Sequence, residues 1–218
     1  MFPALYAILD ACLDPSIGPR SSLPYALELA DAGVRLMQLR DKRGTARAIY
    51  EHAQELAERL APHGVRLIVN DRPDIAAMAG AGGVHVGQED LAVEEARRIC
   101  GPPGWVGVST HNLEQFREAT GTSADYIAVG PLFPTQTKEN PEPVVGIEFL
   151  RAARGLTRKP IVAIGGITVE RAEEVFRAGA DAVAVIEDLA LAEDPAARAR
   201  EYLAIAERVR AELALGQG

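Results

Sequence analysis

The sequence predicts a single-domain (β/α)8 TIM barrel spanning residues 1–218. Short apolar segments alternate eight times with amphipathic segments of helical period along the chain. Strands that are apolar on both faces are covered on both faces, which is typical of a parallel sheet with helical crossovers. Eight such units in 218 residues match a closed barrel. An open doubly wound sheet is the alternative, and it is disfavoured because no GxGxxG segment follows the first expected strand.

The expected strands are aliphatic and β-branched runs that stop at glycine or at a polar residue. In chain order they are 5–9, 35–40, 65–69, 83–86, 105–108, 126–129, 161–164 and 182–186. Residues 126–129, for example, read YIAV and are stopped by Gly130 and Pro131. Each run has the length of a buried strand and is too short for an independent helix.

The expected helices lie between these strands. In chain order they are 24–32, 46–60, 74–80, 91–99, 113–119, 146–154, 171–178 and 194–213. Thr45, Asn112 and Asp194 stand at helix starts, where a side-chain oxygen can accept hydrogen bonds from free backbone N–H groups. Gly33 and Gly179 stand at helix ends, where a left-handed backbone is common.

Composition restricts the class of protein. Hydrophobic residues make up 48% and charged residues 25% of the chain, as in ordinary soluble domains. The net charge of −8 argues against binding to nucleic acid or to an anionic membrane, but it allows a local cationic site for a phosphorylated small molecule. Cys12 and Cys100 lack metal or redox spacing, and we find neither a signal peptide nor a run of transmembrane length. We therefore expect a cytoplasmic protein, and a homo-oligomer remains open.

Polar residues collect where the expected strands end. They are Gln38, Arg40, Asp41 and Lys42; Asn70, Asp71 and Arg72; Gln88, Glu89 and Asp90; Ser109 and His111; Thr135, Thr137 and Lys138; and Gly165 and Gly166. The opposite ends carry mainly Gly, Pro and Ala. Because barrel enzymes build their sites from the loops that follow the strands, we expect the active site at this end.

Two aspartates close consecutive strands, at Asp71 and Asp90. Paired carboxylates without His or Cys suit Mg²⁺, which keeps waters and takes its other oxygens from a substrate diphosphate. The alternative is that both are capping residues, since Asp90 directly precedes an expected helix. Asn70 fits as a donor to a diphosphate or a water, although Asn-Asp is also a common turn pair.

Several basic and glycine residues suit phosphate groups. Arg40 and Lys42 are two residues apart at the end of the second expected strand, so both side chains can point to the same side and contact diphosphate oxygens. A surface ion pair with Asp41 is the alternative. The Gly165-Gly166 pair has no side chains to cover its backbone amides, and it lies beside the end of the eighth strand, a frequent phosphate site in barrels.

Two histidines fall in or after expected strands. His85 lies within an apolar strand and is expected to be a hydrogen-bonded core residue. His111 follows Ser109 without an evident carboxylate partner, which argues against a nucleophilic triad.

Together these segments resemble the thiamine phosphate synthase family across nearly the whole chain. The matching motifs are QLRDK (38–42), NDR (70–72), GVHVGQED (83–90), GVSTHN (107–112), GPLFPTQTK (130–138) and AIGGI (163–167). The family joins a hydroxymethylpyrimidine diphosphate to a thiazole phosphate, in its carboxylate form, and releases diphosphate. The resemblance implies a Mg²⁺-dependent transferase of thiamine biosynthesis with the barrel fold.

The resemblance also implies roles for individual residues. The pyrimidine diphosphate is held by Gln38, Leu39, Arg40, Asp41, Lys42 and Asn70, and Mg²⁺ by Asp71 and Asp90. Ser109 and Lys138 flank the reacting centre and, with Arg40, form the catalytic set. The thiazole phosphate is received by Thr135, Gln136, Thr137, Gly165, Gly166 and Glu187, and Ile186 is a further substrate-binding residue.

Three positions depart from the family pattern. Gly82 stands where the family usually has Asp, Ala182 where it usually has Gly, and Glu187 where a Ser usually helps to bind the thiazole phosphate. A carboxylate facing a phosphate is unfavourable. We therefore expect Glu187 to turn outward, towards an arginine.

Two alternative functions stay open. One is a thiazole tautomerase-like relative that acts on the thiazole carboxylate phosphate, with His111 as acid or base. The other is a non-catalytic protein that binds a thiamine precursor. The retained QED aspartate and PTxTK loop favour the synthase.

Overall fold

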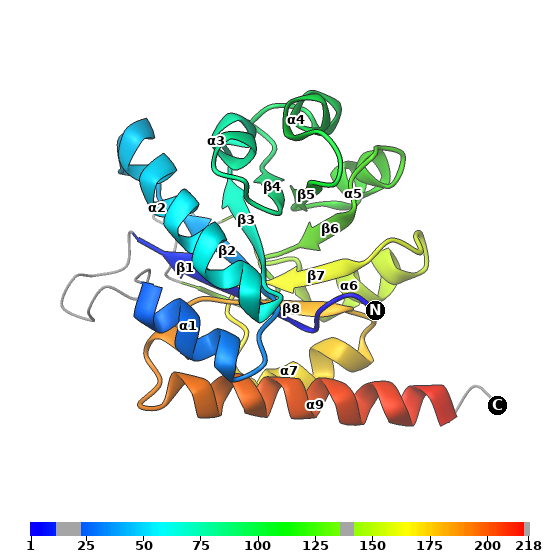
Figure 1. Cartoon of the computed structure of the whole chain (residues 1–218). Coiled ribbons are helices and arrows are strands. Elements are labelled where there is room, and N and C mark those ends of the chain that lie inside the picture. The colour runs from blue at the N-terminus through cyan, green and yellow to red at the C-terminus, as the bar shows by residue number, and fades with distance from the viewer. Residues whose placement is uncertain (12–22, 136–141, 216–218) are drawn as a thin grey trace.

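The computed structural model describes residues 1–11, 23–135 and 142–215. Eight parallel strands pair in sequence order and close through β1 and β8 into a barrel (Figure 1). The strands are β1 Leu5–Asp10, β2 Leu36–Arg40, β3 Arg66–Asn70, β4 Gly83–Val86, β5 Trp105–Thr110, β6 Tyr126–Val129, β7 Ile161–Ile164 and β8 Ala182–Val185. The predicted barrel is confirmed, and the open sheet is excluded.

Helices surround the barrel. They are α1 Leu23–Asp31, α2 Ala46–Leu60 with the 3₁₀ turn η2 Ala61–His63, α3 Pro73–Met78, α4 Val93–Cys100, α5 Leu113–Thr120, α6 Gly146–Arg154, α7 Val169–Arg177, α8 Glu187–Ala190 and α9 Pro195–Leu215. The predicted caps are confirmed at Thr45 and Asn112, whose side chains accept hydrogen bonds from backbone N–H groups at 3.2 and 2.9 Å. Asp194, predicted to open the last helix, accepts such a bond at 2.7 Å. The long helix α9 packs against α1 and α7 (Figure 1). Among the described residues, none of the helices has the length and apolar character needed to span a bilayer.

Side chains alternate between two cores because successive residues of a strand point to opposite faces. The larger core lies between the strands and the helices and includes Leu9, Leu39 and Val69. The smaller one fills the barrel interior. Its buried members come from six strands and include Tyr6, Ile68 and Tyr126. Aromatic and aliphatic side chains therefore fill the barrel interior, and the polar site lies at the carboxyl ends of the strands.

The predicted elements agree with the observed ones to within two residues at each end, and one helix was not predicted. Helix α4 starts at Val93 rather than at residue 91, and Ala92 occupies its N-terminal cap position. The short helix α8, Glu187–Ala190, was not predicted. Its four residues make about one turn, which is too short to show helical periodicity in a sequence.

Candidate active site

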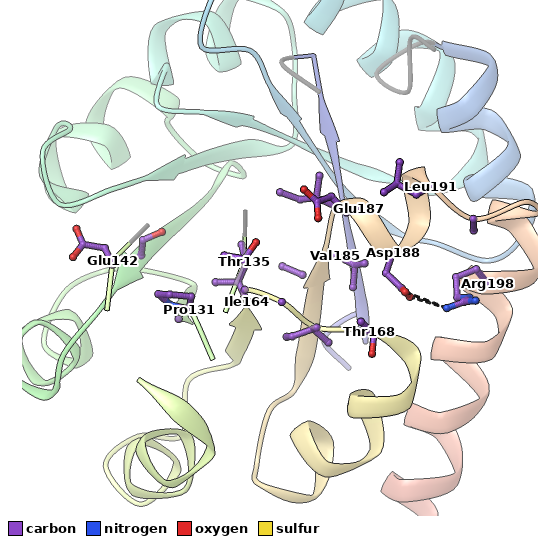
Figure 2. A pocket seen from close by; sticks show the side chains of 18 of the residues that line it. Pro131, Thr135, Glu142, Ile164, Thr168, Val185, Glu187, Asp188, Leu191 and Arg198 are labelled. Carbon is purple, nitrogen blue, oxygen red and sulfur yellow. Dashed lines mark hydrogen bonds and ion pairs between the residues drawn. The ribbon is translucent and has the colours of Figure 1, made fainter. Parts of the chain in front are cut away.

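A cavity of about 400 Å³ opens at the carboxyl ends of β5 to β8 (Figure 2). Of the residues predicted to form the site, it is lined by Ser109, Thr135, Gly165, Gly166, Ile186 and Glu187. These residues come from four different strand ends between Ser109 and Glu187, and barrel closure brings them to one wall. The structure thus places this part of the predicted set together.

The end of β2 carries two of the predicted residues on the interior face. Gln38 is 3% exposed and its amide nitrogen donates to the Tyr6 hydroxyl at 2.7 Å. Arg40 pairs with Asp10 at 2.5 Å, and Asp10 is 2% exposed. Asp10 was not among the predicted site residues. It stands opposite Arg40 in the parallel pairing of β1 and β2, which makes it the residue that orients this guanidinium.

The three other residues of the same motif have different surroundings. The side chain of Leu39 lies in the core between the strands and the helices, so only its main chain can reach the barrel mouth. Asp41 accepts hydrogen bonds from the backbone N–H groups of Arg43 and Gly44, at 2.9 and 2.7 Å, and so shapes the loop. Lys42 donates to Asp71, which joins the loop after β2 to the loop after β3.

The side chains of Asp71 and Asp90 are close enough to interact. Burial raises the pKa of Asp71; Lys42 acts in the opposite direction, and the neighbouring Asp90 raises this pKa further. Asp90 accepts a hydrogen bond from the backbone N–H of Gly87 at 2.7 Å, and Ala92, not Asp90, stands at the cap position of α4. The alternative that Asp90 caps this helix is therefore wrong.

These two carboxylates fit a hard divalent cation. Two adjacent acidic oxygens, one on a partly buried side chain, favour positive charge between them, and Lys42 supplies one such charge. Within the described parts of the chain, no three His, Cys, Asp or Glu side chains form a metal-binding group. A cation at this pair would take its remaining oxygens from waters and a substrate, as Mg²⁺ commonly does. Asn70, the last residue of β3, is half-buried beside it.

The loop after β7 brings backbone amides to the cavity wall. Gly165 and Gly166 have φ angles of 97° and 62°, a region that favours glycine. A Cβ atom on Gly166 would lie 2.5 Å from the carbonyl oxygen of Pro134, so no larger residue fits there. The loop after β6 is fixed to this turn because the N–H of Phe133 donates to the Gly165 carbonyl at 3.1 Å. This geometry suits a bound phosphate.

Glu187 does not turn away from the site. It is half-buried and lines the cavity (Figure 2), so the expected outward orientation is wrong. Its neighbour Asp188 lies 3.1 Å from Arg198 and accepts a hydrogen bond from Tyr202 at 2.7 Å. The one-turn helix α8 explains the difference, because it presents consecutive residues in different directions.

Ser109 and two histidines complete the described site. His85 is 7% exposed and its Nε2 lies 2.8 Å from Ser109 Oγ, so the prediction of a hydrogen-bonded core histidine is confirmed. Gln88 donates to the Ser109 carbonyl at 2.6 Å. His111 lines the cavity, with Nδ1 2.6 Å from the Gly130 carbonyl oxygen, to which it donates. Three predicted residues, Gln136, Thr137 and Lys138, lie outside the described residues.

Fold and site together define a (β/α)8-barrel enzyme whose polar groups gather at the carboxyl ends of the strands. The family model described as thiamine monophosphate synthase matches residues 5–189. The chain belongs to this family.

Individual relatives agree with the family match. A thiamine-phosphate synthase of Koribacter versatilis is 52% identical over 204 residues, which cover 93% of this chain and 95% of the relative. A thiamine-phosphate synthase of Shouchella clausii is 40% identical over 203 residues, covering 93% and 96%. Among solved structures, thiamine phosphate pyrophosphorylase from Pyrococcus furiosus superimposes with a TM-score of 0.83 at 34% identity, covering 94% of this chain and 96% of that one.

The structure gives physical reasons for the other two departures from the family pattern. A Cβ atom on Gly82 would lie 2.5 Å from Cγ of Arg66, whose guanidinium donates to the Gly82 carbonyl at 2.9 Å. The Arg66 side chain therefore fills the space that another side chain would need. Ala182 is fully buried among the residues of the barrel interior, where its methyl group adds to the packing.

Proposed function

We propose that the chain is a thiamine-phosphate synthase, a transferase that joins a hydroxymethylpyrimidine diphosphate to a thiazole phosphate and releases diphosphate. The observation that carries this proposal is the arrangement of the barrel mouth. The Asp71–Asp90 pair lies next to Lys42 at the ends of β3 and β4, and the glycine turn of Gly165 and Gly166 lines the cavity at the ends of β5 to β8. One substrate diphosphate and one substrate phosphate each have a matching group of residues.

In this proposal the protein acts by positioning and by stabilising charge. Arg40 and Lys42 donate to the oxygens of the departing diphosphate, and Lys138 adds a third positive charge. Asp71 and Asp90 would hold Mg²⁺, which would supply further positive charge to neutralise the diphosphate. The pyrimidine methylene then becomes a carbocation-like electrophile, and the thiazole nitrogen attacks it.

The cavity has the properties that this second substrate needs. Its wall of Pro131, Ile164, Ile186 and Leu191 offers apolar contacts to the thiazole ring, and the amides of Gly165 and Gly166 receive its phosphate. We place the reaction in the cytoplasm, where the half-buried free thiol of Cys100 stays reduced.

A coupling assay tests the proposed function. The purified chain is incubated with both substrates, with and without Mg²⁺, and thiamine phosphate and diphosphate are quantified. We expect equal amounts of both products, formed only with Mg²⁺. Isomerisation of the thiazole carboxylate phosphate without coupling would instead identify a tautomerase. Tight binding of a substrate without any product would identify a binding protein.

Glu187→Ser is expected to lower the KM for the thiazole phosphate about tenfold. At an effective dielectric near 20, two unit charges about 5 Å apart repel by roughly 3 kcal/mol, and solvent in a half-open cavity reduces this to about 1.4 kcal/mol. Steady-state kinetics at saturating pyrimidine diphosphate measure the change. Glu193→Ser, on an exposed residue nearby, is the control and should leave the KM as it is. An unchanged KM in Glu187→Ser would show that the carboxylate does not oppose the bound phosphate.

A further inference from the structure

A chain of side-chain hydrogen bonds crosses the barrel interior and ends at the cavity. Its members come from β2, β1, β6, β4 and β5. Gln38 Nε2 lies 2.7 Å from the Tyr6 hydroxyl, and the Tyr6 hydroxyl lies 2.9 Å from the Tyr126 hydroxyl. The Tyr126 hydroxyl lies 3.1 Å from His85 Nδ1, and His85 Nε2 lies 2.8 Å from Ser109 Oγ. The first four residues are at most 7% exposed, and Ser109 lines the cavity. The chain therefore connects a buried amide to the wall of the active site.

The proton positions in this chain follow from its first member. The amide nitrogen of Gln38 can only donate, so the Tyr6 hydroxyl accepts that bond. Its single proton then goes to the Tyr126 hydroxyl, which is the other side-chain partner of Tyr6 in the described part of the chain. Tyr126 in turn donates to Nδ1 of His85. An imidazole that accepts at Nδ1 is neutral and carries its proton on Nε2, so His85 donates to Ser109 Oγ.

Burial keeps both tyrosines in the form that this chain needs. It raises the pKa of Tyr6 and of Tyr126 well above the ordinary value for a phenol. Each hydroxyl therefore stays protonated at neutral pH, with one proton to donate. Ring packing holds the members in place, since the Tyr6 and Tyr126 rings meet edge to face at 5.8 Å and His85 stacks on Tyr126 at 5.6 Å.

The direction of the chain decides what Ser109 can do. A serine next to a histidine at 2.8 Å has the spacing of a nucleophile and its base. Here Nε2 already carries a proton and cannot accept the one on Ser109. The serine oxygen accepts from His85, and its own proton is left to point towards the cavity.

We propose that Tyr6, Tyr126 and His85 are positioning residues that fix His85 as its Nε2–H tautomer and so make Ser109 a hydrogen-bond donor to the substrate in the cavity. The catalytic part of this inference rests on the proposed function, because the acceptor is an oxygen of the diphosphate, which gains negative charge as it leaves the pyrimidine beside the cavity. A simpler reading is that the chain only satisfies buried polar groups. The two readings differ in the effect expected when the chain is broken far from Ser109.

Histidine side-chain nitrogen NMR on the free wild-type protein tests the tautomer without any substrate. We expect His85 to show an unprotonated Nδ1 and a protonated Nε2 at neutral pH. Tyr126→Phe removes the donor to Nδ1, and the His85 resonances should shift towards a mixture of the two tautomers. Thr110→Val is the matched control, because it also removes a buried hydroxyl from a barrel strand, one that donates to the Ala128 carbonyl at 2.9 Å outside the chain. This control should leave the His85 resonances in place.

A double-mutant cycle tests the action through Ser109. We expect Tyr126→Phe to lower kcat about tenfold, with each KM changed less than twofold. Once Ser109→Ala is present, Tyr126→Phe should lower kcat no further, and Thr110→Val should have little effect in either background. A purely structural role would reduce kcat by the same factor with and without the serine hydroxyl.

The proposal is overturned if wild-type His85 carries its proton on Nδ1, or if the effects of Tyr126→Phe and Ser109→Ala multiply. If Tyr126→Phe does not fold, Tyr6→Phe takes its place in both experiments, and the wild-type nitrogen resonances still decide the tautomer. If the wild-type chain does not couple the two substrates, the proposed function fails, while the NMR result still decides the direction of the hydrogen-bonded chain.

Discussion

Replacing either member of the Asp71–Asp90 pair by asparagine should lower Mg²⁺-dependent coupling about a hundredfold or more, because an amide is a much weaker ligand for Mg²⁺ than a carboxylate. The structure allows this substitution to isolate the charge. Asp71 has a φ angle of 61°, and asparagine tolerates this left-handed region as well as aspartate does. Asp90 accepts from the Gly87 N–H, and an asparagine oxygen can accept the same bond.

Initial rates measured over a range of Mg²⁺ concentrations check this expectation. A variant that has lost metal affinity should regain part of its rate at high Mg²⁺. Asp74→Asn is the control, since Asp74, in the first turn of α3, pairs with Arg72 at 2.6 Å and is half-exposed. Such a surface pair contributes little to stability, so this variant should keep nearly the wild-type rate. Full Mg²⁺-dependent turnover by both Asp71→Asn and Asp90→Asn would refute the metal assignment.

Arg40→Gln should lower kcat/KM for the pyrimidine diphosphate about a hundredfold, because a guanidinium that binds a diphosphate in a partly buried site contributes a strong charge-assisted hydrogen bond. The same change should destabilise the fold. Arg40 pairs with the buried carboxylate of Asp10, and removing one member of such a pair costs about 3 kcal/mol.

The double variant Asp10→Asn with Arg40→Gln separates these two effects. It removes both charges, so the free energy of unfolding measured with urea should return close to that of the wild type. Activity should stay low, because the diphosphate still lacks its guanidinium. Recovery of activity together with stability would mean that Arg40 serves the fold rather than the substrate.

The sequence by itself determined the barrel and the end of it that carries the site. Apolar runs alternating with amphipathic segments define the parallel strands and their order. Hydrophobic periodicity is visible in short stretches of sequence, and consecutive parallel strands joined by a helix lie next to each other. The polar residues at strand ends, such as Asp71 and Asp90, could be recognised for the same reason. A short helix such as α8 could not, since a single turn leaves no period to read.

Which side chains meet was decided only by the tertiary structure. Tyr6 and Tyr126 are 120 residues apart, and nothing in their local sequences indicates that their hydroxyls lie 2.9 Å from each other. Asp10 becomes the partner of Arg40 through the register of β1 and β2, and Glu187 faces the cavity through the turn that follows β8. The alternation of residues along a strand tells which side chains point into the barrel. Barrel closure and strand register then set which of them come within hydrogen-bonding distance across its interior, because these distances depend on how all eight strands pack together.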